Sequence, residues 1–443
     1  MVLQTTLLKL IAATFTTLVY FAVYQSQLSI HISISYSLFG SIIIILMLHL
    51  CVVGRQLIFL FQPSLLLVTA VSLLIAIGGL GFHHGWALTH WIEQTVSWQN
   101  LEIHLTFFYV FFLLMIFFYN RKKLRPGLNL PGNSRLKIIT FAVISILASV
   151  AMATVNLPFA SQVVAVGFIG YCLHICNIQN LKTRMLLYLT LFIPIALLLH
   201  DDKRDAIFLL FPLFIIELLQ NPEKKLNFKS LFTIFYITFG VLIMIVLATV
   251  LRAAEYYEIN KLIDIFSAAR TYVFSELFLG YFLQNIEATY TYFHTINAIE
   301  MWTFQKLDAL SGGSYVKAFF VTFPREIFDF KPQKASYWYT LTYDEKYRLS
   351  GGSWAVSMFG EAYLNFQIFG ALILVSILKF FDYLFYSITL RPAYKNYMIN
   401  IMKLYLPVAF LDFSRGAGLD SIVIYLCVVM FASLILEACL RYR

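Results

Sequence analysis

Long apolar runs are the feature that most constrains the fold of this 443-residue chain. A helix of about 20 apolar residues spans the hydrocarbon layer of a bilayer, and a soluble core does not need many such runs. Hydrophobic residues make up 60% of the chain and charged residues only 12%, far from the composition of a globular domain. The sequence therefore predicts an all-α, polytopic membrane protein with about twelve transmembrane helices, at residues 5–24, 34–53, 63–82, 101–119, 138–156, 158–177, 185–199, 206–220, 231–251, 362–386, 397–411 and 420–438.

The basic residues of the short loops predict the orientation of these spans. The loop 120–137 holds six Lys and Arg residues and no acidic one, which assigns it to the cytoplasm. Alternation of the spans then places both termini in the cytoplasm and three polar segments outside, at 200–205, 252–354 and 412–420. The formal net charge of +9 follows from this topology and from contact with the lipid bilayer, so it implies no nucleic-acid partner.

The same spans divide the chain into three parts. Residues 1–251 and 355–443 form the transmembrane bundle, and 252–354 form a large outer loop domain. Apolar periodicity predicts a mostly helical loop, with helices at 252–274 and 281–309. Eleven of the 27 tyrosines lie in this loop, where their rings suit either sugar stacking or a membrane interface.

Two polar stretches stand out against the apolar background. Residues 200–205 place six ionisable side chains between apolar runs, as either a solvated turn or a binding clamp. Farther along, Trp354, Ser357, Glu361 and Asn365 are predicted to share one stripe of the tenth span. A carboxylate at that depth is costly unless it is paired or functional.

Residues 323–370 carry a resemblance to a known family. The loop contains Phe-Pro-Arg-Glu-Ile-Phe-Asp-Phe-Lys-Pro at 323–332, and Gly-Glu-Ala-Tyr-Leu-Asn-Phe at 360–366 leads into the next span and Gly370. With the twelve-span layout, these residues resemble the Wzy-type oligosaccharide repeat-unit polymerases of bacterial surface polysaccharide synthesis. One departure is Gln367, where the family pattern has glycine.

The resemblance implies a glycosyltransferase with a GT-C-like architecture. Such an enzyme transfers a growing glycan from undecaprenyl pyrophosphate to a sugar hydroxyl of another lipid-linked repeat unit. The reaction takes place at the outer, periplasmic face of the bacterial inner membrane and builds O-antigen, capsule or exopolysaccharide. A flippase and a chain-length regulator of the same pathway would be its partners.

Other functions remain open from the sequence. An O-antigen ligase or another lipid-linked-sugar glycosyltransferase shares this architecture and chemistry. A polysaccharide transporter or flippase fits less well, because neither an internal repeat nor mid-membrane charges are evident. The sequence has no metal-ligand spacing and no Gly-rich phosphate loop, and the five cysteines lie in apolar runs, so no metal or cofactor is expected.

The resemblance and the chemistry of the reaction select the candidate site residues. A leaving pyrophosphate needs guanidinium or ammonium groups, and a sugar hydroxyl needs a general base. The pyrophosphate candidates are Arg204, Arg325 and Arg415, followed by Arg270 and Lys331. Glu361 is the first candidate for the base or for orienting the acceptor, ahead of His294 and Asp205. The candidates for glycan contact are Trp338, Tyr363 and Asn365.

Overall fold

A computed structural model describes ten segments of the chain and several single positions. The segments are 2–53, 62–86, 100–119, 135–155, 160–175, 262–276, 278–303, 310–321, 331–389 and 397–441, and the single positions are 178, 187, 212, 243, 246, 247, 249, 250 and 323. Within these residues all regular elements are helices, in agreement with the predicted all-α class.

Nine of the helices correspond to predicted spans. In the first half of the chain they are α1 (Val2–Gln25), α2 (Ile30–Val53), α3 (Pro63–His83), α4 (Leu101–Phe117), α5 (Arg135–Val155) and α6 (Ala160–Ile175). In the second half they are α18 (Gly370–Thr389), α19 (Tyr397–Ser414) and α20 (Leu419–Arg441). The spans predicted at 185–199, 206–220 and 231–251 lie outside the described residues, apart from single positions.

Five stretches of the described chain are long and apolar enough to cross a membrane: Gln4–Gln25, Ile30–Val52, Pro63–His83, Met358–Ile388 and Leu419–Ala438. Their large apolar side chains are not all buried. On α1, Leu10, Phe15, Leu18 and Phe21 are exposed, as expected of a helix that faces lipid. The chain is therefore a helical membrane protein, and the number of twelve spans stays a prediction.

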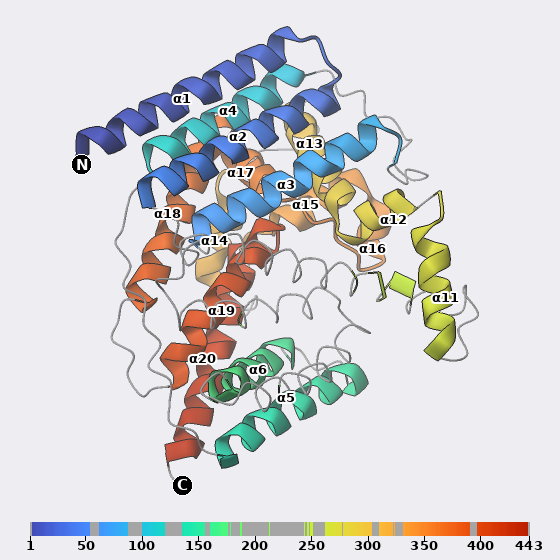
Figure 1. Ribbon diagram of the computed structural model, residues 1–443, viewed down its shortest axis with the longest axis vertical. Helices are drawn as coiled ribbons and strands as arrows, with labels where there is room; N and C mark the ends of the chain where they lie inside the picture. The colour runs from blue at the N-terminus through green and yellow to red at the C-terminus, as the bar shows by residue number, and fades with distance from the viewer. Residues whose placement is uncertain are drawn as a thin grey trace.

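The first four helices form one side of the bundle, where α1, α2, α3 and α4 run side by side (Figure 1). Small residues allow the close approach that membrane helices use in place of a hydrophobic driving force. A Cβ on Gly78 of α3 would lie 2.2 Å from the carbonyl oxygen of Ala288, at the start of α13 (Ala288–Thr303). α13 is therefore held directly against a membrane span.

The other side of the bundle consists of α5, α6, α19 and α20. The hairpin of α5 and α6 packs through α6 on α19 and α20 (Figure 1). α18 joins the two sides because it contacts α3, α4 and α19.

The described residues of the large loop are mostly helical, as predicted. Their helices are α11 (Leu262–Val273), α12 (Phe278–Asn285), α13, α14 (Gly313–Phe320), α15 (Ala335–Tyr343) and α16 (Glu345–Leu349). The single helix predicted at 281–309 is wrong: α12 ends at Asn285 and α13 begins at Ala288. Between them Glu287 has a φ of 62°, which a continuous helix does not allow.

The start of the tenth span also differs from the prediction. α17 (Met358–Phe366) is separated from α18 by a 3₁₀ turn at Gln367–Phe369. Gln367 has a φ of 54°, a backbone region that favours glycine. This is the position at which the family pattern has glycine. Trp354 precedes α17 and is not part of its stripe, which holds Glu361 and Asn365 behind the N-cap Ser357.

Candidate functional site

A polar cavity of about 710 Å³ lies where four parts of the chain meet. Its walls come from the start of α6, from α14, from the stretch 333–355 and from the turn between α19 and α20. Four of its lining side chains are cationic, Lys317, Lys334, Arg348 and Arg415, and one is acidic, Asp412. The remaining polar lining includes Gln162, Gln333, Tyr337, Ser421 and Tyr425. The cavity thus suits an anionic ligand that also offers hydroxyl groups.

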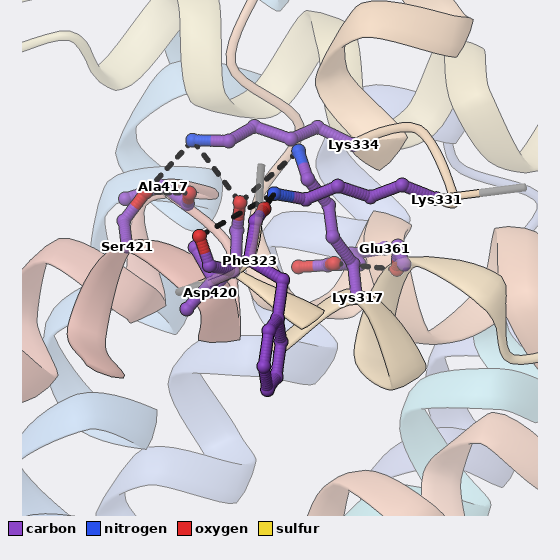
Figure 2. Close-up of polar contacts among 10 residues, drawn as sticks. Lys317, Phe323, Lys331, Lys334, Glu361, Ala417, Asp420 and Ser421 are labelled. Atoms are coloured by element: carbon purple, nitrogen blue, oxygen red, sulfur yellow. Dashed lines mark hydrogen bonds and ion pairs between the residues drawn. The ribbon is translucent and has the colours of Figure 1, made fainter. Parts of the chain in front are cut away.

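Two of the lysines share a buried carboxylate at the cavity wall. Lys317 Nζ lies 3.1 Å from Asp420 Oδ2, and Lys334 Nζ lies 3.5 Å from the same oxygen (Figure 2). Lys334 also donates a 2.8 Å hydrogen bond to Ser421 Oγ. Asp420 stands in the first turn of α20, where the helix dipole stabilises an anion. The carboxylate therefore holds both ammonium groups at the cavity without neutralising both.

Glu361 lies behind this cavity wall. It is 2% exposed, and it is not among the lining residues. Ser314 Oγ donates to Glu361 Oε1 at 2.7 Å, and Asn365 Nδ2 donates to Ser314 Oγ at 2.8 Å. Glu361 Oε2 is buried and meets no donor among the described residues. The carboxyl group thus connects α17 to α14, the helix that carries Lys317.

Aromatic packing and a close backbone contact fix these elements. The ring of Phe359 on α17 makes edge contacts with Phe107, Phe108 and Phe111 of α4. Gly416, with a φ of 94°, lies so close to the stretch before α17 that a Cβ would sit 1.7 Å from the Val356 carbonyl oxygen. The turn that carries Arg415 is therefore in direct contact with the backbone before Glu361.

The two arginines of the cavity have different surroundings. Arg415 forms an ion pair with Glu287, from the break between α12 and α13. Arg348 donates a 2.7 Å hydrogen bond to the Gly352 carbonyl, and its guanidinium lies 4.1 Å from the ring centroid of Tyr337. Both side chains are thus oriented before any ligand arrives, which lowers the entropic cost of binding.

His294 of α13 belongs to a separate aromatic cluster. Its Nδ1 lies 2.9 Å from the Tyr339 hydroxyl, and its ring stacks on Trp354 with 4.7 Å between centroids. Burial lowers the pKa of His294 to about 3. A general base works best with a pKa near the operating pH, so this histidine is poorly suited to that role.

The other predicted site residues fall into three groups. Arg204, Asp205 and Arg325 lie outside the described residues. Arg270 is exposed on α11 and is not in the cavity lining. Lys331 is not in the lining either. It donates to the carbonyl of Phe323 (Figure 2) and to the carbonyl of Val321. The three glycan candidates are packed in the protein: Trp338 in a small apolar cluster, Tyr363 between Phe107 and Trp302, and Asn365 against Ser314.

Of the eight described candidates, Arg415 alone lines the cavity. Sequence reasoning missed Lys317, Lys334, Arg348, Tyr337 and Asp412. Lys317 carried a usable signal, since it is the single charge in the otherwise uncharged helix Gly313–Phe320. The described residues contain no group of three or more His, Cys, Asp or Glu side chains placed to hold a metal ion. The chain matches no protein-family model, no curated protein and no solved structure.

Proposed function

We propose that this protein is a Wzy-type polymerase, which joins undecaprenyl-pyrophosphate-linked oligosaccharide repeat units into a surface polysaccharide. The cavity lined by Lys317, Lys334, Arg348 and Arg415 is the observation that carries the proposal. A diphosphate is the leaving group of this reaction, and clustered guanidinium and ammonium groups stabilise the charge that develops on it.

The hydroxyl chemistry assigns roles to two carboxylates. Asp412 is the one acid among the cavity-lining residues, so it is the group placed to accept a proton from the sugar hydroxyl of the acceptor. Glu361 acts through its neighbours, because its hydrogen bond to Ser314 holds the helix of Lys317 in place. Tyr337, Tyr425 and Gln333 line the same cavity and are the candidates for contact with sugar rings and hydroxyls.

The proposal includes the finer architecture and the location. The chain has about twelve spans in a GT-C-like arrangement, sits in the bacterial inner membrane with both termini in the cytoplasm, and works on the periplasmic side. Support comes from the walls of the cavity, since the start of α6, the large loop and the turn before α20 are all segments that the basic loops assign to the outer face.

A glycan ladder from a deletion strain tests the reaction. We expect long chains to disappear while glycan with one repeat unit on its final acceptor persists. Loss of all capped glycan, including the single unit, would contradict polymerisation and identify a ligase or an exporter.

Complementation tests the cavity. Lys334→Ala and Arg348→Ala should each shorten the ladder at normal protein levels, because each removes one cation from the cavity. Lys346→Ala is the matched control: it removes an exposed lysine two residues before Arg348 that does not line the cavity. Equal ladders from all three variants would show that these cavity cations do not contribute to polymerisation.

A further inference from the structure

α14 buries its polar side and exposes its apolar side, the reverse of a surface helix in a water-soluble protein. Its buried side carries Ser314 and Lys317, which reach Glu361 and Asp420. Its outward side carries Val316 and Phe319, and Phe319 is 78% exposed. Phe323, just beyond the helix, is exposed as well. In water such a surface would be unfavourable, whereas in hydrocarbon it is the expected arrangement.

The neighbours of α14 place it beside membrane spans. It packs against α20, whose stretch Leu419–Ala438 is long and apolar enough to cross a membrane. It also contacts α17, where the stretch Met358–Ile388 begins. Asp420, the partner of Lys317, is in the first turn of α20. The outward side of α14 therefore lies at the level of the end of a span, where acyl chains and headgroups meet.

From this placement we infer that the outward side of α14, formed by Val316, Phe319 and Phe323, binds the apolar tail of the lipid whose diphosphate occupies the cavity. Lys317 projects from the opposite side of the same short helix into the cavity wall. A ligand held by both sides of α14 is an amphiphile with an anionic head and an apolar tail. It reaches the cavity sideways from the bilayer, past Phe319. The inference rests on the proposed function for the identity of the lipid as a prenyl diphosphate.

The location of α14 is measured first. Spin labels are attached to single cysteines at positions 316 and 319 of the full chain in phosphatidylcholine nanodiscs. Both labels should have high accessibility to molecular oxygen, which partitions into lipid, and low accessibility to a water-soluble nickel complex. A label at Phe21, an exposed residue of α1, is the lipid-facing reference, and one at Lys346 is the aqueous reference. Nickel accessibility at 319 equal to that at 346 would overturn the inference.

Binding of the tail is measured with two probes on the same nanodiscs. Farnesyl diphosphate carries a prenyl tail, and inorganic pyrophosphate carries none. Phe319→Ser should weaken farnesyl diphosphate about tenfold, equivalent to about 1.4 kcal/mol, and leave pyrophosphate unchanged. Lys317→Gln should weaken both probes, and Phe319→Leu, which keeps an apolar surface, should bind both nearly as the wild type does.

Phe21→Ser controls for general effects of a polar group at the lipid surface. If it weakens farnesyl diphosphate as much as Phe319→Ser does, the tail has no specific surface on α14 and the inference fails. Neither probe contains a glycan, so the binding result is independent of polymerisation. If the proposed function is wrong, the glycan ladder will show it, while Phe319→Ser will still weaken farnesyl diphosphate and not pyrophosphate.

Discussion

At the scale of single residues, Asp412 and Glu361 differ in their access to the cavity. Asp412 lines the cavity, whereas Glu361 is enclosed and bound by Ser314. General-base catalysis typically contributes about 10²–10⁴-fold. Asp412→Asn should therefore lower the rate of chain extension by that order, with normal amounts of membrane-inserted protein, as measured by the glycan ladder and a blot of the same cells.

Glu361→Gln should have a smaller effect, because the amide oxygen still accepts from Ser314. Glu361→Leu leaves the Ser314 hydroxyl without its acceptor and should cost about 1–3 kcal/mol of stability, visible as less inserted protein. An abundant but fully inactive Glu361→Gln protein would reverse these assignments and make Glu361 the base.

The buried His294 predicts a dependence of stability on pH. Its pKa is about 3 in the folded protein because of burial, against an ordinary value of 6.5. Between these values the unfolded chain binds a proton that the folded chain does not. The free energy of unfolding is therefore unaffected by this histidine above pH 6.5, and it falls as the pH drops from 6.5 toward 3. The thermal midpoint of the purified protein should drop from pH 7.5 to pH 5, and less so in His294→Gln. Parallel curves for the two proteins would refute the assignment.

At the scale of elements, the junction of α17 and α18 stores strain at Gln367. A non-glycine residue in such a sparsely populated region costs about 1–3 kcal/mol, while a new glycine adds about 0.4–1 kcal/mol of unfolded-state entropy. Gln367→Gly should therefore stabilise the protein by about 1 kcal/mol in thermal unfolding. Ser376→Gly, in the exposed middle of α18, is the control and should destabilise it. Destabilisation by both would mean that the Gln367 side chain contributes more than the strain costs.

The contact between the α19–α20 turn and the stretch before α17 is tested at Gly416. Gly416→Ala adds a Cβ that overlaps the Val356 carbonyl, so the turn must move and carry Arg415 with it. Gly351→Ala is a matched control, because Gly351 has a φ of 93° and open space at its Cβ position. Both variants share the backbone strain, and we expect a further loss of activity and stability in Gly416→Ala alone.

The same elements explain what the sequence predicts well. Span length is dictated by the bilayer, so the predicted runs 34–53, 63–82 and 101–119 match α2, α3 and α4 within a few residues. Periodicity does not reveal a single residue with positive φ. Glu287 and Gln367 each divide a predicted helix, and Trp354 lies in a non-helical stretch, although the predicted stripe required it to be part of a helix.

The cavity was harder to predict because its residues are distant in sequence. Lys317, Lys334 and Arg415 come together only when α14, α15 and the turn before α20 are packed. Chemistry and proximity to a motif favoured Tyr363 and Asn365, which packing places in the interior. Residue type alone therefore did not identify which of the chain's cationic side chains line the cavity.

At the scale of the whole molecule, polar groups gather at two levels of the bundle. One level holds the cavity and its lysines. At the other, Asp382 of α18 accepts hydrogen bonds from the Ser64 amide at 2.9 Å and from Gln62 Nε2 at 2.7 Å, and so caps the start of α3. The alternation of spans assigns the start of α3 to the cytoplasmic side and the end of α19 to the outer side. On this prediction, the cavity and the Asp382 cluster face opposite sides of the membrane.

Cysteine labelling tests this orientation across the chain. In a background without the five native cysteines, cysteines at positions 129 and 226 should react with an impermeant maleimide only after the inner membrane is permeabilised, because both lie in loops rich in Lys and Arg. Cysteines at 308 and 417 should react in cells whose inner membrane is intact. Position 417 is the decisive one, since Ala417 lines the cavity. If a cysteine there reacts only after permeabilisation, the cavity faces the cytoplasm. Polymerisation at the outer face would then be impossible, whereas binding of a diphosphate lipid by α14 would still stand on its own measurement.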